Sequence, residues 1–191
     1  NKRAVVIAVE SPTATFQLDD YSMANIVSAA IFGDGAACVL MSSYENEVGP
    51  TIVDESMYHF YDKENMMGFE LTNKGLKMIL DIEVPNTIEE HFPAILHPFL
   101  ERNQLEIKDI EHLIFHPGGK KIVNLVEGLF SDLGKNIDDT KEVLRLYGNM
   151  SSTTVLYVLE RIMNNQPKAG EKGVMLSFGP GFTAQRVLLE F

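Results

Sequence analysis

Residues 112–130, HLIFHPGGKKIVNLVEGLF, decide the fold class. The first four of them form a short apolar run that predicts a buried strand. Beyond the two glycines, apolar residues recur at helical spacing, and they are Ile122, Val123, Val126, Leu129 and Phe130. A strand that leads through a glycine loop into a helix is the building unit of layered α/β folds, so we expect this class.

The residues after this unit continue the alternation of helices and strands. The elements predicted here are helices over 140–147 and 151–163 and strands over 173–178 and 183–191. Ser151 or Ser152 can cap the second helix, and the turn Gly179-Pro180-Gly181 joins the two strands. A strand-helix-strand unit followed by a strand pair supports the layered α/β prediction.

The residues before the unit show the same kind of pattern. The predicted elements are strands over 4–9, 36–41, 51–61 and 67–80 and helices over 21–31 and 85–99. The run 4–9 is continuously apolar, which is typical of a buried strand. Breaks are expected in two elements: at Gly68 and Gly75 in the extended segment, and at Pro93 and Pro98 in the helix, which the prolines should kink or interrupt.

A polar segment, 42–50, separates two parts of the chain and carries turn residues that suit a connection. We place a domain boundary there, so the expected units are 1–45 and 46–191. The sequence begins without Met and enters an apolar run almost at once. We therefore expect unit 1–45 to be the truncated end of a larger domain.

The composition excludes several functional classes. The net charge of −11 over 191 residues and the pI of 4.8 argue against nucleic-acid binding, which needs a basic face to neutralise phosphates. The one cysteine, Cys38, cannot form an intrachain disulfide, and this favours a reducing, cytoplasmic location. No apolar run reaches the roughly 18 residues of a membrane helix, so no membrane association is expected.

His116 is the first candidate for chemistry, because it stands where a predicted strand ends and a glycine loop begins. Sheets of α/β proteins place ligand-binding groups at such ends. The backbone N–H groups of Gly118 and Gly119 can approach a ligand, and the helix start behind them favours an anion or a developing oxyanion. The alternative is a histidine that only satisfies its own turn.

Asn149 is the second candidate, since it precedes a predicted helix within Gly148-Asn149-Met150-Ser151-Ser152. Its amide can donate a hydrogen bond into a site, or it can belong to a capped turn. The histidines do not follow a zinc-binding spacing, so no metal is expected. Cys38 lies in an apolar predicted strand without basic neighbours, which predicts an inert core thiol.

Four motifs, taken in order, carry a resemblance to a known family. They are Phe32-Gly33-Asp34-Gly35-Ala36-Ala37, His116-Pro117-Gly118-Gly119, Tyr147-Gly148-Asn149-Met150-Ser151-Ser152 and Phe178-Gly179-Pro180-Gly181. The set resembles type III polyketide synthases of the chalcone and stilbene synthase group over the whole chain. The interval from His116 to Asn149 (149 − 116 = 33) is also similar to that of the family. Ketoacyl synthase III enzymes share the thiolase fold, but their loops usually differ from this set, so they are the second choice.

The resemblance implies a thiolase-like layered α-β-α fold of two similar halves, with 1–45 as the end of the first half and 46–191 as the second. It implies decarboxylative Claisen condensation of acyl-CoA with malonyl-CoA, both of them substrates, and no cofactor. In the family, a cysteine at the start of a buried helix accepts the acyl group. By resemblance this cysteine would lie before Asn1, and Cys38 does not match it. The fragment alone is therefore expected to be inactive.

By resemblance, His116 would hold that cysteine as a thiolate, and His116 with Asn149 would stabilise the oxyanion of the thioester. Substrate-contacting positions are implied as well, and they are Phe16, Met78, Gly118, Gly119, Ser151, Phe178, Gly179, Pro180 and Gly181. Phe16 matches an aromatic gatekeeper, with a core aromatic as the alternative. Met78 aligns loosely with a second gatekeeper, and Ser177 stands where the family usually has Gly.

Two lysines and the assembly complete these expectations. Lys120 and Lys121, beside the glycine loop, could meet coenzyme A phosphates, or they could simply be solvated. The resemblance implies a homodimer. A non-catalytic alternative is a degenerate thiolase-fold half that serves as a dimerisation module, because the nucleophile is missing from these residues.

Overall fold

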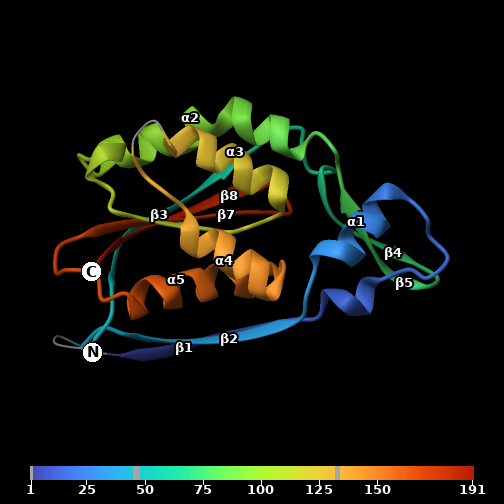
Figure 1. Cartoon of the computed structure of the whole chain (residues 1–191), viewed down its shortest axis with the longest axis horizontal. Helices are drawn as coiled ribbons and strands as arrows, with labels where there is room; N and C mark the ends of the chain where they lie inside the picture. The colour runs from blue at the N-terminus through green and yellow to red at the C-terminus, as the bar shows by residue number, and fades with distance from the viewer. Residues whose placement is uncertain (1, 45–47, 132–133) are drawn as a thin grey trace.

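The centre of the molecule is a four-stranded mixed sheet with the strand order β3-β8-β7-β6 (Figure 1). The computed structural model describes residues 2–44, 48–131 and 134–191. The strands of this sheet are β3 (Thr51–His59), β6 (His112–Phe115), β7 (Lys172–Gly179) and β8 (Thr183–Glu190). Strands β6 and β7 are parallel, whereas β8 is antiparallel to both of its neighbours.

Helices cover both faces of this sheet and complete three layers. They are α2 (Val84–Arg102) and α3 (Lys120–Ser131) on one face and α4 (Asp138–Tyr147) and α5 (Thr154–Asn164) on the other. Strand β6 serves both faces, because Leu113 and Phe115 pack with the first pair of helices and Ile114 packs with the second. The prediction of a layered α/β fold is therefore confirmed.

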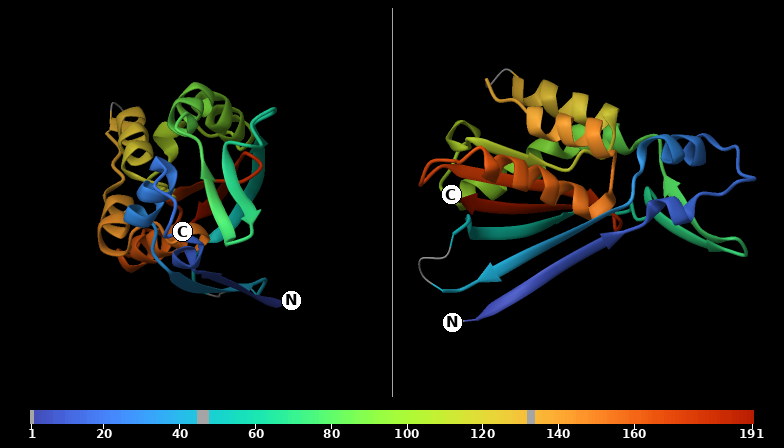
Figure 2. Two further views of the ribbon diagram at one scale, coloured as in Figure 1. Left: turned by 90° about the vertical axis from the view of Figure 1, so that its right-hand side faces the viewer. Right: turned by 60° about the horizontal axis from the view of Figure 1, so that its bottom comes forward.

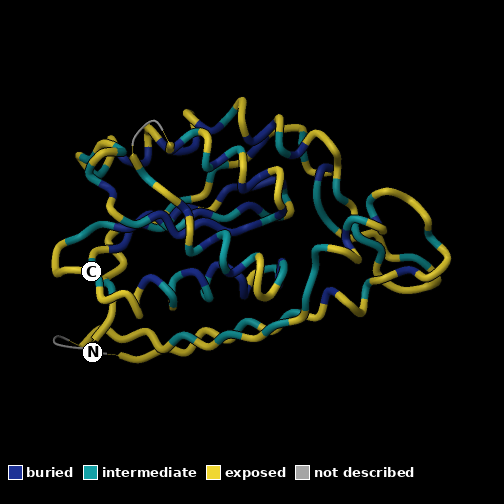
Figure 3. Tube along the Cα trace, viewed as in Figure 1, coloured by how far each residue is buried: buried dark blue, intermediate teal, exposed yellow. Residues whose placement is uncertain are grey.

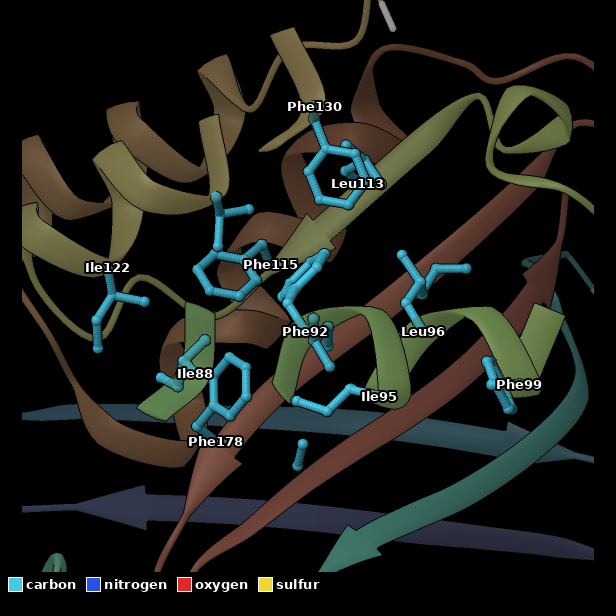
Figure 4. Packing of buried hydrophobic residues seen from close by; sticks show 14 of the residues in the cluster. Ile88, Phe92, Ile95, Leu96, Phe99, Leu113, Phe115, Ile122, Phe130 and Phe178 are labelled. Atoms are coloured by element: carbon cyan, nitrogen blue, oxygen red, sulfur yellow. The ribbon is translucent and has the colours of Figure 1, made fainter. Parts of the chain in front are cut away.

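The larger core lies between the sheet and the α2–α3 pair, as Figures 3 and 4 show. Helix α2 supplies an apolar stripe at helical spacing, which consists of Val84, Ile88, Phe92, Ile95, Leu96, Phe99 and Leu100. Of the two effects predicted for Pro93 and Pro98, a kink or an interruption, the interruption does not occur, since both prolines lie inside one continuous helix. Both prolines are exposed, and burial of the stripe outweighs the helical hydrogen bonds that they remove.

Two antiparallel strand pairs lie outside the main sheet. Strand β1 (Arg3–Glu10) pairs with β2 (Gly35–Ser42), and β4 (Met67–Thr72) pairs with β5 (Gly75–Leu80). The β4–β5 pair lies beside α1 (Met23–Ile31) at one end of the molecule (Figures 1 and 2). Gly75 begins β5 at the turn, as predicted, but the break predicted at Gly68 is wrong because this residue pairs with Ile79 inside β4.

The β1–β2 ribbon corrects two predictions of burial. Five residues share its outward side, the outer ribbon face, and they are Val5, Ile7, Val9, Cys38 and Leu40. All five are exposed, Val9 to 72%, so the strands form as predicted but this face packs against none of the described residues. Cys38 is an exposed thiol and not the core thiol that its apolar neighbours suggested.

Details at two connections also differ from the sequence expectations. Ser151 and Ser152 open a short 3-10 turn that ends at Thr153, and neither side chain caps α5. The predicted boundary between residues 45 and 46 lies outside the described residues. Within the part of the chain that the structure describes, no helix is both long and apolar enough to cross a membrane.

Candidate active site

His116 follows directly on β6, and backbone hydrogen bonds on both sides fix its position. Its N–H donates to the carbonyl of Leu176 at 2.9 Å, which carries the β6–β7 pairing one residue further. Its carbonyl accepts from the N–H of Gly118, also at 2.9 Å, and this closes a tight turn. The imidazole is thereby held in the interior, with only 9% of the residue exposed.

Burial lowers the pKa of His116 from 6.5 to about 4, because desolvation penalises the charged imidazolium. The ring is therefore neutral at pH 7, with one nitrogen that donates and one that accepts. A neutral imidazole can donate to a developing oxyanion. Beside a thiolate it would also gain basicity, because a neighbouring negative charge raises the pKa of a histidine.

Asn149 joins segments that are far apart in the sequence. Its backbone forms a parallel bridge with Phe32, in which its N–H donates to the carbonyl of Ile31 at 2.8 Å. Its side-chain Nδ2 donates to the carbonyl of Gly118 at 3.1 Å, and its Oδ1 accepts from the N–H of Ser151 at 2.9 Å. These contacts define the orientation of the amide, and only one of the two Nδ2 hydrogens is used by the described residues.

Two glycines allow the backbones around Asn149 to approach this closely. A Cβ on Gly33 would lie 2.6 Å from the carbonyl oxygen of Tyr147, and a Cβ on Gly148 would lie 2.6 Å from that of Ile31. Gly148 also has a φ of +71°, which other residues rarely adopt. The motifs at 32–37 and 147–152 are therefore one structural unit.

Phe16 and Met78, the two expected gatekeepers, line one pocket of about 260 Å³. The other lining residues are Pro12, Thr13, Thr15, Asn25, Ser28, Ala29 and Phe32. Phe16 is 45% exposed, so it is not the core aromatic that was the alternative, and Ser28 Oγ donates to Met78 Sδ at 3.2 Å. His116 and Asn149 do not line this pocket, but Phe32 does, and it is bridged to Asn149.

The glycine-proline turn after β7 occupies the end of that strand. Phe178 is buried, and its ring contacts those of Phe115 and Phe182 at centroid distances of 6.0 and 6.2 Å. In Figure 4 it lies within the core, whereas Pro180 is exposed. Gly179 and Gly181 are half-buried. None of these four residues lines the pocket at Phe16.

The remaining expectations concern charged groups and metals. Lys120 and Lys121 are exposed at the start of α3, and among the described residues neither forms an ion pair. In the ranges 2–44, 48–131 and 134–191, no three His, Cys, Asp or Glu side chains gather closely enough to hold a metal ion.

Sequence reasoning missed the polar side of the pocket. Asn25 and Ser28 are buried residues of α1 that line it, and Ala29 and Phe32 extend the same wall. The available signal was the run of small residues Ser28-Ala29-Ala30, which leaves room beside a helix. Phe32 is the first residue of the motif 32–37, but it was not among the predicted substrate-contacting residues.

Comparison with known proteins now identifies the family. The model of the C-terminal domain of chalcone and stilbene synthases matches residues 53–191. The chain belongs to this family. The chalcone and stilbene synthases are type III polyketide synthases, so the resemblance seen in the four motifs is confirmed.

Several members of the family match almost the whole chain. The 1,3,6,8-tetrahydroxynaphthalene synthase of Streptomyces peucetius subsp. caesius is 35% identical over 193 residues, which cover 98% of this chain and 51% of that protein. The phloroglucinol synthase of Pseudomonas fluorescens is 30% identical over 191 residues, with 98% and 54% covered. The chain thus spans about half the length of the curated relatives it matches.

Solved structures of this family have the same fold. The 1,3,6,8-tetrahydroxynaphthalene synthase of Streptomyces coelicolor A3(2), a bacterial type III polyketide synthase, superposes with a TM-score of 0.90 at 25% identity. This match covers 99% of the chain and 54% of the solved structure. PKS-I of the brown alga Ectocarpus siliculosus gives 0.86 at 28% identity, with 99% and 52% covered. The fold is that of the C-terminal half of these thiolase-like enzymes.

Proposed function

We propose that this chain is the C-terminal part of a type III polyketide synthase that condenses an acyl-CoA with malonyl-CoA by a decarboxylative Claisen reaction. In this proposal residues 1–45 end the first thiolase-like half, and the second half supplies His116 and Asn149. The acyl-accepting cysteine would come from residues that precede Asn1. The working enzyme would be a homodimer.

The observation that carries the proposal is the hydrogen bond from Asn149 Nδ2 to the carbonyl of Gly118. This bond ties the turn that holds Asn149 to the loop that directly follows His116. The two side chains that the family resemblance selects, 33 residues apart in sequence (149 − 116), therefore belong to one hydrogen-bonded framework. Both are buried, which strengthens any hydrogen bond to a developing charge.

The chemistry assigned to these groups is the stabilisation of negative charge on oxygen. When malonyl-CoA loses CO₂, the electron pair of the broken C–C bond becomes an enolate, whose oxygen would accept from the imidazole and from the free Nδ2 hydrogen of Asn149. The enolate carbon then attacks the acyl thioester, and the cysteine thiolate leaves. His116 would stabilise that thiolate before loading and after release.

The test uses a protein in which this chain is joined to the preceding half of the enzyme. Asn149→Ala and His116→Gln are compared with the wild type for product formation from acyl-CoA and malonyl-CoA, and for CO₂ release from malonyl-CoA. His97→Gln is the matched control, because His97 is exposed on α2. Loss of one oxyanion donor is worth about 10²–10³ in rate.

We expect both site variants to lose at least this factor in condensation, and we expect the control to retain its rate. Normal condensation by Asn149→Ala would contradict its role in the site. Activity with acyl-carrier-protein donors and none with CoA donors would instead favour a ketoacyl synthase III-like enzyme. No condensation by the joined wild-type protein would favour the non-catalytic module.

A further inference from the structure

Asp34 accepts three hydrogen bonds from Ser11 and Thr13, at the start of the segment that leads to Phe16. Its Oδ1 accepts from the backbone N–H of Thr13 at 3.0 Å. Its Oδ2 accepts from the hydroxyl of Thr13 at 2.6 Å and from the hydroxyl of Ser11 at 3.2 Å. Both carboxylate oxygens are thus occupied by a segment about 20 residues earlier in the chain.

The segment that Asp34 binds forms one wall of the pocket. Pro12–Thr15 is a single 3-10 turn, and Phe16 follows it directly. Pro12, Thr13, Thr15 and Phe16 all line the pocket, as does Met78. Phe16 is therefore the last residue of a short wall whose first part is fixed to Asp34. The blue segment and the β4–β5 pair meet at this end of the molecule in Figure 2.

A second side chain holds the segment after Phe16. Asn25 Nδ2 donates to the carbonyl of Gln17 at 2.7 Å, and Asn25 Oδ1 accepts from the N–H of Gln17 at 3.2 Å. Gln17 in turn donates from Nε2 to the carbonyl of Leu76 at 3.3 Å. The wall is thus held on both sides of Phe16, by Asp34 before it and by Asn25 after it.

Asp34 also lies in the connection between α1 and β2, which contacts the backbone of Asn149. Phe32 is bridged to Asn149, and Gly33 donates its N–H to the Asn149 carbonyl at 3.0 Å. Asp34 is the next residue in the chain. The four-residue segment 32–35 therefore contacts the backbone of Asn149 on one side and the pocket wall on the other.

We propose that Asp34 is a positioning residue that determines which acyl starters the pocket accepts, by fixing the wall formed by residues 12–16. This inference rests on the proposed function. Asp34 contacts no substrate in this scheme, and it acts through Thr13 and Phe16. Without the carboxylate, the wall loses three hydrogen bonds and Phe16 can move away from Met78, so the pocket becomes less selective for the size of the acyl chain.

The experiment measures kcat/KM of the joined enzyme for acetyl-CoA and for decanoyl-CoA, each with malonyl-CoA. Asp34→Ala is compared with Asp34→Asn, which keeps an oxygen for the Thr13 N–H, and with Ser11→Ala, which removes one bond only. The control is Asp62→Asn, because Asp62 is exposed after β3 and makes no hydrogen bond with the described residues. CO₂ release from malonyl-CoA alone reports on the chemistry at Asn149.

In Asp34→Ala we expect the ratio of the larger to the smaller kcat/KM value to fall about tenfold toward one. The reason is the loss of hydrogen bonds to a charged group. CO₂ release should change less than about threefold. Asp34→Asn and Ser11→Ala should shift the ratio less, in the same direction. An unchanged ratio in the folded variants, or equal losses for both starters and for CO₂ release, would overturn this inference alone. A joined wild-type enzyme that condenses neither starter would overturn the proposed function, and this inference with it.

Discussion

His116 is neutral in the folded protein because its surroundings do not solvate the charged ring. In the unfolded chain the same ring has an ordinary pKa of 6.5. Protons therefore bind preferentially to the unfolded state between pH 6.5 and about 4, and folding stability must fall as the pH falls through this range. The same burial that keeps the ring neutral at pH 7 makes the fold sensitive to acid.

The first prediction follows from this linkage. Between pH 7 and pH 4, His116 should lower the free energy of unfolding by roughly 3 kcal/mol, from a pKa shift of about 2.5 units. Urea titrations at pH 7, 5.5 and 4 measure this loss, and His116→Gln should lack this part of it. If wild type and His116→Gln lost the same stability over this range, the ring would not be buried as described, and His97→Gln serves as the control.

A second prediction at this scale concerns Gly148. A methyl group there would meet the carbonyl of Ile31 and would require a residue other than glycine at φ +71°. Gly148→Ala should therefore reduce the free energy of unfolding by about 1–3 kcal/mol. Gly128→Ala is the matched control, since Gly128 lies in α3 with open space around its Cα, and should be neutral or stabilising by about 0.5–1 kcal/mol. Equal effects in denaturant titrations would contradict the close approach.

At the level of the elements, α4 is tied to the strand that leads into the site. The hydroxyl of Thr140, which is fully buried, donates to the carbonyl of Phe115 at 3.0 Å. Phe115 is the last residue of β6 and immediately precedes His116. A hydrogen bond at this point orients the end of the strand as well as the helix.

The third prediction is that Thr140→Val destabilises the protein by about 1–3 kcal/mol, because it leaves a buried carbonyl without its partner while keeping the side-chain shape. Thermal and urea unfolding measure the effect. Thr72→Val is the comparison, since the hydroxyl of Thr72 serves only an exposed turn. A loss in Thr140→Val no larger than that in Thr72→Val would show that the bond does not hold the strand.

Most elements could be predicted from the sequence, because each has a local periodic signal. The strand 112–115 and the helix after Gly119 are clear examples. The continuity of α2 across Pro93 and Pro98 could not be predicted, since it depends on the core that the helix buries. The exposure of the strand 4–9 could not be predicted either. An apolar run indicates a strand, but it does not show which other residues pack against that strand.

The candidate residues of the site can be selected from the sequence, but the contacts that connect them cannot. His116 and Asn149 stand in recognisable motifs, whereas the bond between Asn149 and Gly118 depends on how α4 returns to the sheet. The pocket wall at Asn25 and Ser28 resembles an ordinary helix in sequence. This wall can be identified only from the structure, in which α1 contacts β5.

For the whole molecule, the dominant feature is the uncovered outer ribbon face, whose residues Val5, Ile7, Val9 and Leu40 are all at least half exposed. Apolar surfaces of this kind on soluble chains promote association. The sheet and its helices form a complete three-layer unit beside it.

The fourth prediction is that the chain, produced by itself, self-associates through this face. Ile7→Lys should shift it toward the monomer, because a charge at the centre of the face opposes apolar contact. Light scattering across a dilution series measures the mass. Lys168→Glu is the control, because it also changes the charge of the chain but lies in an exposed turn before β7 and not on the outer ribbon face. A monomeric wild-type chain at all concentrations would contradict the prediction.

Cys38 is exposed and is the single thiol of the chain, so its reaction with a thiol reagent shows whether the ribbon is covered. Its side chain lies at the centre of the ribbon, opposite Ile7, so any polypeptide that covers the ribbon must also shield the sulfur. A maleimide should label the monomeric chain at high dilution within minutes. Self-association at higher concentration, or a covered ribbon in a longer protein, should slow the labelling. Mass spectrometry can therefore follow the covering of this ribbon without an added dye, tag or mutation.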